Sequence, residues 1–141
     1  MIRSIVVICT GNVCRSPMAA SMLRAAFPAK NVLSAGIGAL VDHPADPIAL
    51  RLMHERGLEL NGHRARQLDF AMLQACELAL VMEQEHKTWV ESTWCATAGK
   101  VYRWGHWSGF DIPDPYRCGE RAFRDVLALL DQGLDDWRGK L

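Results

Sequence analysis

No apolar stretch in the 141-residue sequence approaches the roughly 20 residues that a membrane-spanning helix requires. The apolar run at residues 5–8 is too short for the core of a signal peptide and leads directly into polar residues. An excess of either charge is lacking as well, because 16 basic residues balance 16 acidic residues. This balance argues against broad binding to nucleic acid or to an anionic membrane surface. We therefore expect no membrane insertion, no nucleic-acid partner and a cytoplasmic location.

Metal-binding spacing is also missing. The histidines form no His-x-x-x-His pair, and three cysteines lack any partner at the spacing of a zinc site: Cys76, Cys95 and Cys118. We therefore expect no metal and no other cofactor. In the absence of a secretory signal, the five cysteines indicate reduced thiols instead of a disulfide framework.

Neither a low-complexity linker nor an internal repeat divides the chain, so we expect residues 1–141 to form one domain. Apolar and β-branched runs predict strands at residues 2–9, 32–34, 77–82 and 100–104. Helices are predicted at 45–56, at 83–94, from Ser16-Pro17 onward with Ser16 as cap, and through the periodic positions Phe123, Val126, Leu127, Leu130, Leu134 and Trp137. Strands that alternate with helices predict an α/β three-layer sandwich, in which helices cover both faces of a central parallel four-stranded sheet.

The loop between the first strand and the first helix reads Cys9-Thr10-Gly11-Asn12-Val13-Cys14-Arg15-Ser16-Pro17. In a parallel sheet, ligands bind beyond the carboxyl ends of the strands, where this loop begins. Backbone N–H groups of such a loop can form a nest for phosphate, and the helix N-terminus adds positive partial charge. Gly11 and Asn12 tolerate left-handed backbone angles, and Arg15 can bind two oxygens of the anion. We expect phosphate to bind at Thr10, Gly11, Asn12, Val13, Cys14 and Arg15.

Cys9 is the expected nucleophile of this loop. The helix N-terminus and Arg15 favour its thiolate, and Ser16 can donate a hydrogen bond to the sulfur. A lone cysteine at a strand end is more often a small buried apolar residue. Two other phosphate-binding patterns, G-x-G-x-x-G and the Walker lysine, are absent. A cysteine and an arginine that frame five residues at a strand–helix junction favour attack on phosphorus.

This loop, continued by Met18-Ala19, resembles the signature of the low-molecular-weight protein tyrosine phosphatases. Further matching segments follow in order over essentially the whole chain: Ser34-Ala35-Gly36, Ala45-Asp46-Pro47, residues 62–67 and residues 111–116. Residues 37–41 and 105–107 are most similar to the bacterial branch associated with exopolysaccharide export. The resemblance implies a metal-independent phosphotyrosine phosphatase that works through a phosphocysteine intermediate. It also implies a substrate protein, a bacterial tyrosine autokinase in exopolysaccharide production, and inorganic phosphate as product.

The family resemblance assigns further roles. Asp114 is implied as the general acid that protonates the departing phenolate oxygen and then activates water. Spacing alone does not separate Asp114 from Asp111. The resemblance also implies a hydrogen-bond network of Asn12, Ser16, Ser34 and His63, and a substrate slot lined by Leu40 and Tyr116.

Cys14 lies in the same tight loop as Cys9. We predict that peroxide converts Cys9 to a sulfenic acid and that Cys14 captures it as a reversible disulfide. The alternative is that Cys14 only packs in the loop.

Two other functions stay open at this point. A thioredoxin-coupled arsenate reductase resembles this fold and loop, but it needs further cysteines near the end of the third strand, where residues 80–85 have none. A non-catalytic phosphotyrosine-binding module would need neither the nucleophile Cys9 nor the acid Asp114.

Overall fold

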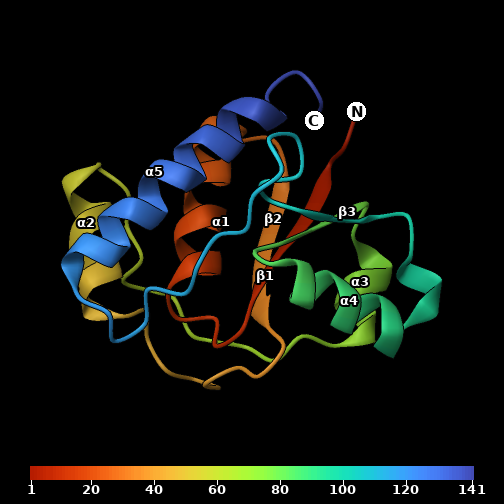
Figure 1. Ribbon diagram of the computed structural model, residues 1–141, viewed down its shortest axis with the longest axis horizontal. Helices are drawn as coiled ribbons and strands as arrows, with labels where there is room; N and C mark the ends of the chain where they lie inside the picture. Colours follow the sequence, from red (N-terminus) through yellow and green to blue (C-terminus); the bar gives the residue numbers. More distant parts are fainter.

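A four-stranded parallel sheet with the strand order β2-β1-β3-β4 lies at the centre of the computed structural model, which describes residues 1–141 (Figure 1). Its strands are β1 (Ser4–Cys9), β2 (Asn31–Gly36), β3 (Leu78–Val81) and β4 (Val101–Arg103). The parallel sheet predicted from the sequence is confirmed, and each predicted strand is present with its ends shifted by a few residues.

Helices cover both faces of this sheet, as the alternating pattern predicts (Figure 1). The helices α1 (Arg15–Ala26), α2 (Pro47–Glu55) and α5 (Glu120–Trp137) lie on one side, and α3 (Phe70–Ala75) and α4 (Gln84–Thr93) lie on the other. A short 3-10 helix, Cys95–Thr97, leads to β4. None of the helices combines the length and the apolar character that crossing a bilayer requires.

The central strand β1 supplies both halves of the core. Ile5 and Val7 pack into the cluster under α1, α2 and α5, whereas Val6 and Ile8 pack into the cluster on the other face. This explains the continuous apolar run, because a strand covered on both faces needs no polar alternation. The six periodic positions of the last helix are all buried, as predicted: Phe123, Val126, Leu127, Leu130, Leu134 and Trp137.

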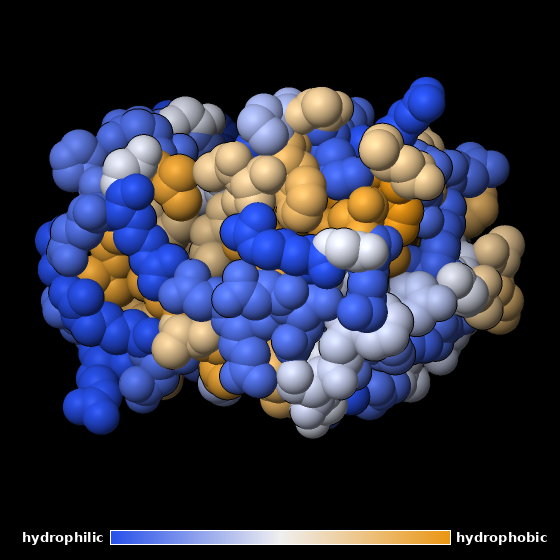
Figure 2. Space-filling model, turned by 90° about the horizontal axis from the view of Figure 1, so that it is seen from above, coloured by the Kyte–Doolittle hydropathy of each residue, from blue (hydrophilic) through white to orange (hydrophobic).

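The surface is mixed in character. In the view from above, hydrophilic residues cover most of the face, and the hydrophobic residues lie in patches between them (Figure 2). This view looks onto the end of the sheet where β1 begins, away from the loop that follows Cys9.

Two predictions about local structure are wrong. Helix α1 begins at Arg15 with Cys14 as N-cap, so Ser16 is not the cap and Pro17 is not the first helical residue. The reason is that the hydroxyl of Ser16 is turned toward Cys9 and Asn12, and it satisfies no backbone group of the helix end. Helix α3 was not predicted from the sequence, because its six residues carry too little periodicity to be recognised.

Candidate active site

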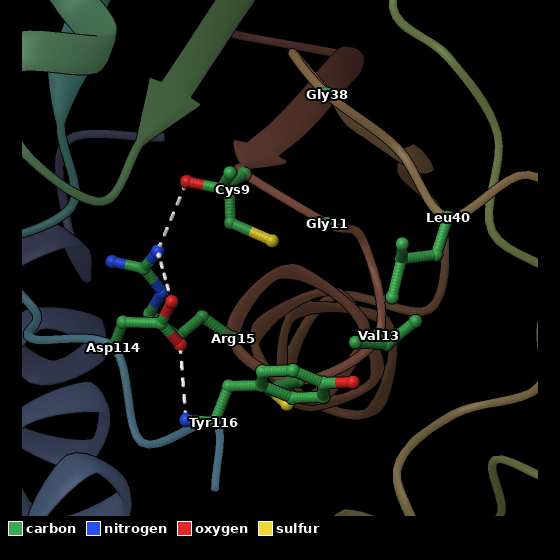
Figure 3. A pocket seen from close by; sticks show the side chains of 10 residues that line it. Cys9, Gly11, Val13, Arg15, Gly38, Leu40, Asp114 and Tyr116 are labelled. Carbon is green, nitrogen blue, oxygen red and sulfur yellow. Dashed lines mark hydrogen bonds and ion pairs between the residues drawn. The ribbon is translucent and has the colours of Figure 1, made fainter.

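The loop after β1 forms the wall of a cavity of about 170 Å³ at the carboxyl ends of the strands (Figure 3). Its lining combines this loop with residues from two other segments: Cys9, Thr10, Gly11, Val13, Cys14, Arg15, Gly38, Leu40, Asp114 and Tyr116. The structure therefore brings together the predicted nucleophile, arginine, acid and slot residues, which come from distant parts of the sequence. We call residues 9–15 the anion loop.

The anion loop is tight because one of its residues adopts a left-handed conformation. Asn12 has φ of 60°, as its residue type allows. Gly11, which also tolerates such angles, does not have a positive φ. The glycine that this loop requires is Gly36, at the end of β2. It lets the backbone of β2 lie close to the anion loop, because a Cβ atom at this position would lie 2.3 Å from the carbonyl oxygen of Thr10.

Asn12 contacts the other three residues of the predicted hydrogen-bond network, Ser16, Ser34 and His63. Its Nδ2 donates to Ser16 Oγ at 2.8 Å and to Ser34 Oγ at 3.0 Å. Its Oδ1 accepts from the backbone N–H of Arg66 at 2.9 Å. The Nε2 of His63 lies 2.7 Å from the carbonyl oxygen of Asn12, so this nitrogen carries the proton. Burial lowers the pKa of His63 and thereby favours the neutral ring.

Cys9 is buried at the floor of the cavity, and its Sγ lies 2.9 Å from Ser16 Oγ. Ser16 Oγ accepts from Asn12 Nδ2, and its single hydrogen faces two acceptors, the sulfur of Cys9 at 2.9 Å and the carbonyl oxygen of Ala35 at 3.5 Å, of which the sulfur is the nearer. A hydroxyl donor next to a thiolate stabilises the charged, nucleophilic form.

Arg15 is only 1% exposed, and its guanidinium is held from several sides. Its Nη1 donates to Glu83 Oε2 and, at 2.8 Å, to the carbonyl oxygen of Ile112. Its Nη2 lies 3.4 Å from Thr10 Oγ1 and 3.7 Å from Asp114 Oδ2. Glu83 was not predicted from the sequence as a partner of Arg15. The available signal was its position just after β3, since β1 and β3 are parallel and end at the same edge.

The two aspartates of the loop before α5 differ in their contacts. Asp114 lines the cavity, its side chain is 50% exposed, and its Oδ1 accepts the backbone N–H of Tyr116 at 3.1 Å. Asp111 accepts the backbone N–H of Gln84 at 3.1 Å and pairs with Arg103 at 3.0 Å. Asp111 is not among the cavity residues, so the geometry distinguishes the aspartates where spacing did not.

The two residues predicted to line the substrate slot, Leu40 and Tyr116, both line this cavity. Leu40 and Tyr116, each 37% exposed, lie at the rim of the cavity opposite Arg15 (Figure 3).

Cys14 is buried in the anion loop, and burial raises the pKa of its thiol well above the usual range. All cysteines are unpaired, and no group of three or more metal-ligating side chains is close enough to hold a metal ion.

The sequence and the fold of this chain are similar to those of known phosphatases. A family model described as "Low molecular weight phosphotyrosine protein phosphatase" matches residues 4–141. The probable low molecular weight protein-tyrosine-phosphatase EpsP of Ralstonia solanacearum is 44% identical over 137 residues, which cover 97% of this chain and 94% of that protein.

Solved structures agree with this match over the full length. The tyrosine phosphatase Wzb from Escherichia coli K30, in complex with sulphate, superimposes with a TM-score of 0.95 at 44% identity and covers 99% of both chains. Vibrio vulnificus Wzb in complex with benzylphosphonate gives a TM-score of 0.95 at 36% identity and covers 100% of both chains.

Proposed function

The chain belongs to the low molecular weight phosphotyrosine protein phosphatase family, and from this premise we propose that it hydrolyses phosphotyrosine in proteins through a phosphocysteine intermediate. One observation carries the proposal: the Sγ of Cys9, the guanidinium of Arg15 and the carboxylate of Asp114 meet at one cavity that an anion loop encloses. The sulphate and benzylphosphonate bound by the related Wzb proteins are tetrahedral oxyanion groups, which supports a phosphate ester as ligand here.

Phosphate binding is assigned to the anion loop. The backbone N–H groups of residues 10–15 and the N-terminus of α1 supply positive partial charge around the three non-bridging oxygens. Arg15 adds a planar guanidinium, which Glu83 and the carbonyl oxygen of Ile112 hold in place. This preorganised charge stabilises the transition state, in which negative charge spreads over the equatorial oxygens.

The first chemical step transfers the phosphoryl group to the enzyme. The thiolate of Cys9 attacks phosphorus, the S–P bond forms and the ester P–O bond breaks on the opposite side. Asp114 gives its carboxyl proton to the departing phenolic oxygen, which is otherwise a poor leaving group because the pKa of a phenol is about 10.

The second step restores the enzyme. Asp114, now a carboxylate, takes a proton from water as the water oxygen attacks phosphorus. The S–P bond breaks, Cys9 leaves as the thiolate that Ser16 stabilises, and inorganic phosphate is released. No step requires a metal ion.

The substrate is a phosphotyrosine protein. The apolar rim formed by Val13, Leu40 and Tyr116 suits the two faces of a phenyl ring. We assign a bacterial tyrosine autokinase of exopolysaccharide production as the partner and the cytoplasm as the location, on the family resemblance and on the similarity to EpsP and Wzb.

Arsenate reduction is the closest rival. The residues after β3 include Met82, Glu83 and Gln84, with no cysteine, and Glu83 serves as a partner of Arg15. The nearby Cys76 lies at the other end of β3. The positions where that chemistry needs thiols are therefore occupied by other groups.

One set of assays separates these functions. We expect hydrolysis of phosphotyrosine peptides in the presence of EDTA and no thioredoxin-dependent reduction of arsenate. Cys9→Ser is expected to lose turnover by about 10⁴-fold or more while it still binds phosphate. Arg15→Lys is expected to lose most activity, because an ammonium cannot bind two oxygens in one plane. Substantial turnover by correctly folded Cys9→Ser would overturn the mechanism.

A further inference from the structure

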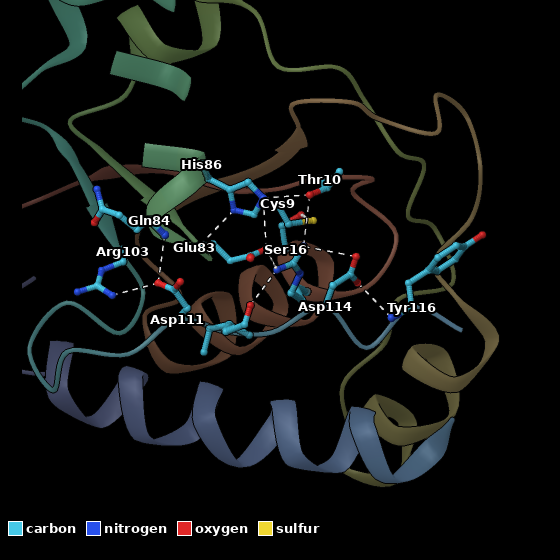
Figure 4. A network of polar contacts seen from close by, with 12 residues as sticks. Cys9, Thr10, Ser16, Glu83, Gln84, His86, Arg103, Asp111, Asp114 and Tyr116 are labelled. Atoms are coloured by element: carbon cyan, nitrogen blue, oxygen red, sulfur yellow. Dashed lines mark hydrogen bonds and ion pairs between the residues drawn. The ribbon is translucent and has the colours of Figure 1, made fainter. Parts of the chain in front are cut away.

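A buried histidine that the proposed mechanism does not use lies beside the anion loop. His86, in the first turn of α4, is 3% exposed. Its Nε2 lies 3.0 Å from Oγ1 of Thr10, the residue that follows the nucleophile Cys9 (Figure 4).

The contacts of the ring determine its tautomer. The backbone N–H of Glu83 donates to Nδ1 of His86 at 3.1 Å. A backbone N–H can only donate, so Nδ1 carries no proton. The neutral ring then has its proton on Nε2 and donates it to Thr10 Oγ1.

Thr10 is left with one free hydrogen. Its Oγ1 accepts one hydrogen bond from His86 Nε2 and a second, at 3.4 Å, from Nη2 of Arg15. These two donors together occupy both lone pairs of the hydroxyl oxygen. The hydroxyl hydrogen must therefore find another acceptor. Thr10 lines the cavity, where an oxygen of a bound oxyanion would be available as acceptor.

We propose that His86 is a positioning residue that fixes the hydroxyl of Thr10 as a hydrogen-bond donor to the oxyanion in the anion loop. The inference rests on the proposed function, because it assigns one more contact to the same site. The loop then offers the anion a side-chain donor in addition to its backbone N–H groups and Arg15.

The charges around His86 support the neutral ring. Burial and the guanidinium of Arg15 lower the pKa of His86, while the carboxylates of Glu83, Asp111 and Asp114 act in the opposite direction. Glu83 Oε2 lies 3.7 Å from Nε2. A proton on Nδ1 would face the N–H of Glu83, so protonation removes the hydrogen bond that orients the ring.

Sulfate is the suitable probe, because it is a tetrahedral dianion that does not titrate between pH 5 and 8, a range of roughly three units around the ordinary histidine pKa. Calorimetric titration reads its binding without any turnover. Thr10→Val removes the hydroxyl at constant shape, and His86→Leu removes the donor to it. His86→Gln keeps a donor and an acceptor at similar reach and cannot titrate, and the exposed His54→Leu is the matched control.

We expect Thr10→Val and His86→Leu each to weaken sulfate binding about 10-fold, which is typical of one hydrogen bond to a charged group. The double variant is expected to bind sulfate no more weakly than either single variant, because both changes remove the same donor. His86→Gln is expected to bind like the parent. His54→Leu is expected to change nothing.

The inference would be overturned by parent-like sulfate binding by Thr10→Val, or by single effects that multiply in the double variant. Parent-like binding by Thr10→Val overturns the inference even where His86→Leu fails to fold, and parent-like binding by a folded His86→Leu overturns it as well. A parent that binds sulfate but does not hydrolyse phosphotyrosine would contradict the proposed function alone.

Discussion

Asp114 and Asp111 belong to one loop, but only the carboxylate of Asp114 faces the cavity and Arg15. We predict that Asp114→Ala slows hydrolysis of phosphotyrosine by about 10²–10⁴-fold, as expected for loss of a positioned acid. An aryl phosphate with a strongly electron-withdrawing ring should be slowed much less, because its leaving group needs no proton. The measurement is the pre-steady-state burst, which isolates phosphorylation of Cys9 from the later attack of water.

Asp111→Ala is the control for this prediction. Asp111 binds the N–H of Gln84 and the side chain of Arg103, so its loss should slow all aryl phosphates alike or not at all. Equal slowing of every substrate in the Asp114→Ala burst would show that Asp114 only positions the loop. A leaving-group-dependent defect in Asp111→Ala would show that Asp111, and not Asp114, is the general acid.

Cys14 provides a second prediction for a single residue. It lines the same cavity as Cys9, and burial raises the pKa of its thiol, so Cys9 is the nucleophile toward phosphorus. When Cys14 attacks the sulfenic acid of Cys9, the S–S bond forms, the S–O bond breaks, and the thiol proton leaves with the hydroxyl group as water. After peroxide and then dithiothreitol, the parent should recover most of its activity, whereas Cys14→Ser should recover much less, because its sulfenic acid is oxidised further. Equal recovery of the two proteins would mean that Cys14 only packs in the loop.

The residues of the anion loop could be predicted from the sequence because they are contiguous and their chemistry depends on local backbone geometry. Glu83 and His86 could not, because their approach to Arg15 and Thr10 depends on β3 lying next to β1. The choice between Asp111 and Asp114 likewise depends on contacts with α4 and with Arg15, which the spacing within one loop does not contain.

Among the elements, α5 was predictable because its long apolar periodicity follows one face of a helix, and its six periodic residues are all buried. The start of α1 was not predictable in the same way. Ser16 has the residue type of an N-cap, but its hydroxyl contacts Cys9, so its place in the site overrides the local preference.

Gly133 tests how closely α5 packs on the loop after β4. A Cβ atom at this position would lie 2.3 Å from Cδ1 and 2.4 Å from Nε1 of the buried Trp104. Alanine is the better helix former, but we predict that Gly133→Ala lowers the free energy of unfolding by about 1–3 kcal/mol, because the collision outweighs the propensity. Urea denaturation measures this difference.

Gly62→Ala is the matched control, since no atom lies within 4 Å of a Cβ there. A more stable Gly133→Ala protein would show that α5 can shift away from Trp104 without loss.

For the whole molecule, two histidines link stability to pH. Burial lowers the pKa of both His63 and His86 from the ordinary value of 6.5. Below pH 6.5 the unfolded chain binds protons at these two positions while the folded chain does not. The contribution of the two neutral histidines to the free energy of unfolding is therefore fully present above pH 6.5. It should fall progressively as the pH decreases toward the folded-state pKa values.

Urea denaturation above and well below pH 6.5 checks this dependence. A variant with both His63→Gln and His86→Gln should lose less stability on acidification than the parent, whereas the exposed His54→Gln should lose as much. If the free energy of unfolding of the double variant falls with decreasing pH as steeply as that of the parent, other groups cause the sensitivity to acid.

The central claim is that Cys9 carries the phosphoryl group during turnover. The direct measurement is rapid acid quenching of the protein during steady hydrolysis of a phosphotyrosine peptide, followed by mass spectrometry of its proteolytic fragments. We predict a phosphate adduct on Cys9 that appears within the burst, disappears when substrate is exhausted and is absent from Cys9→Ser. Continued turnover with no phosphate on Cys9, or with phosphate on another residue, would contradict the account.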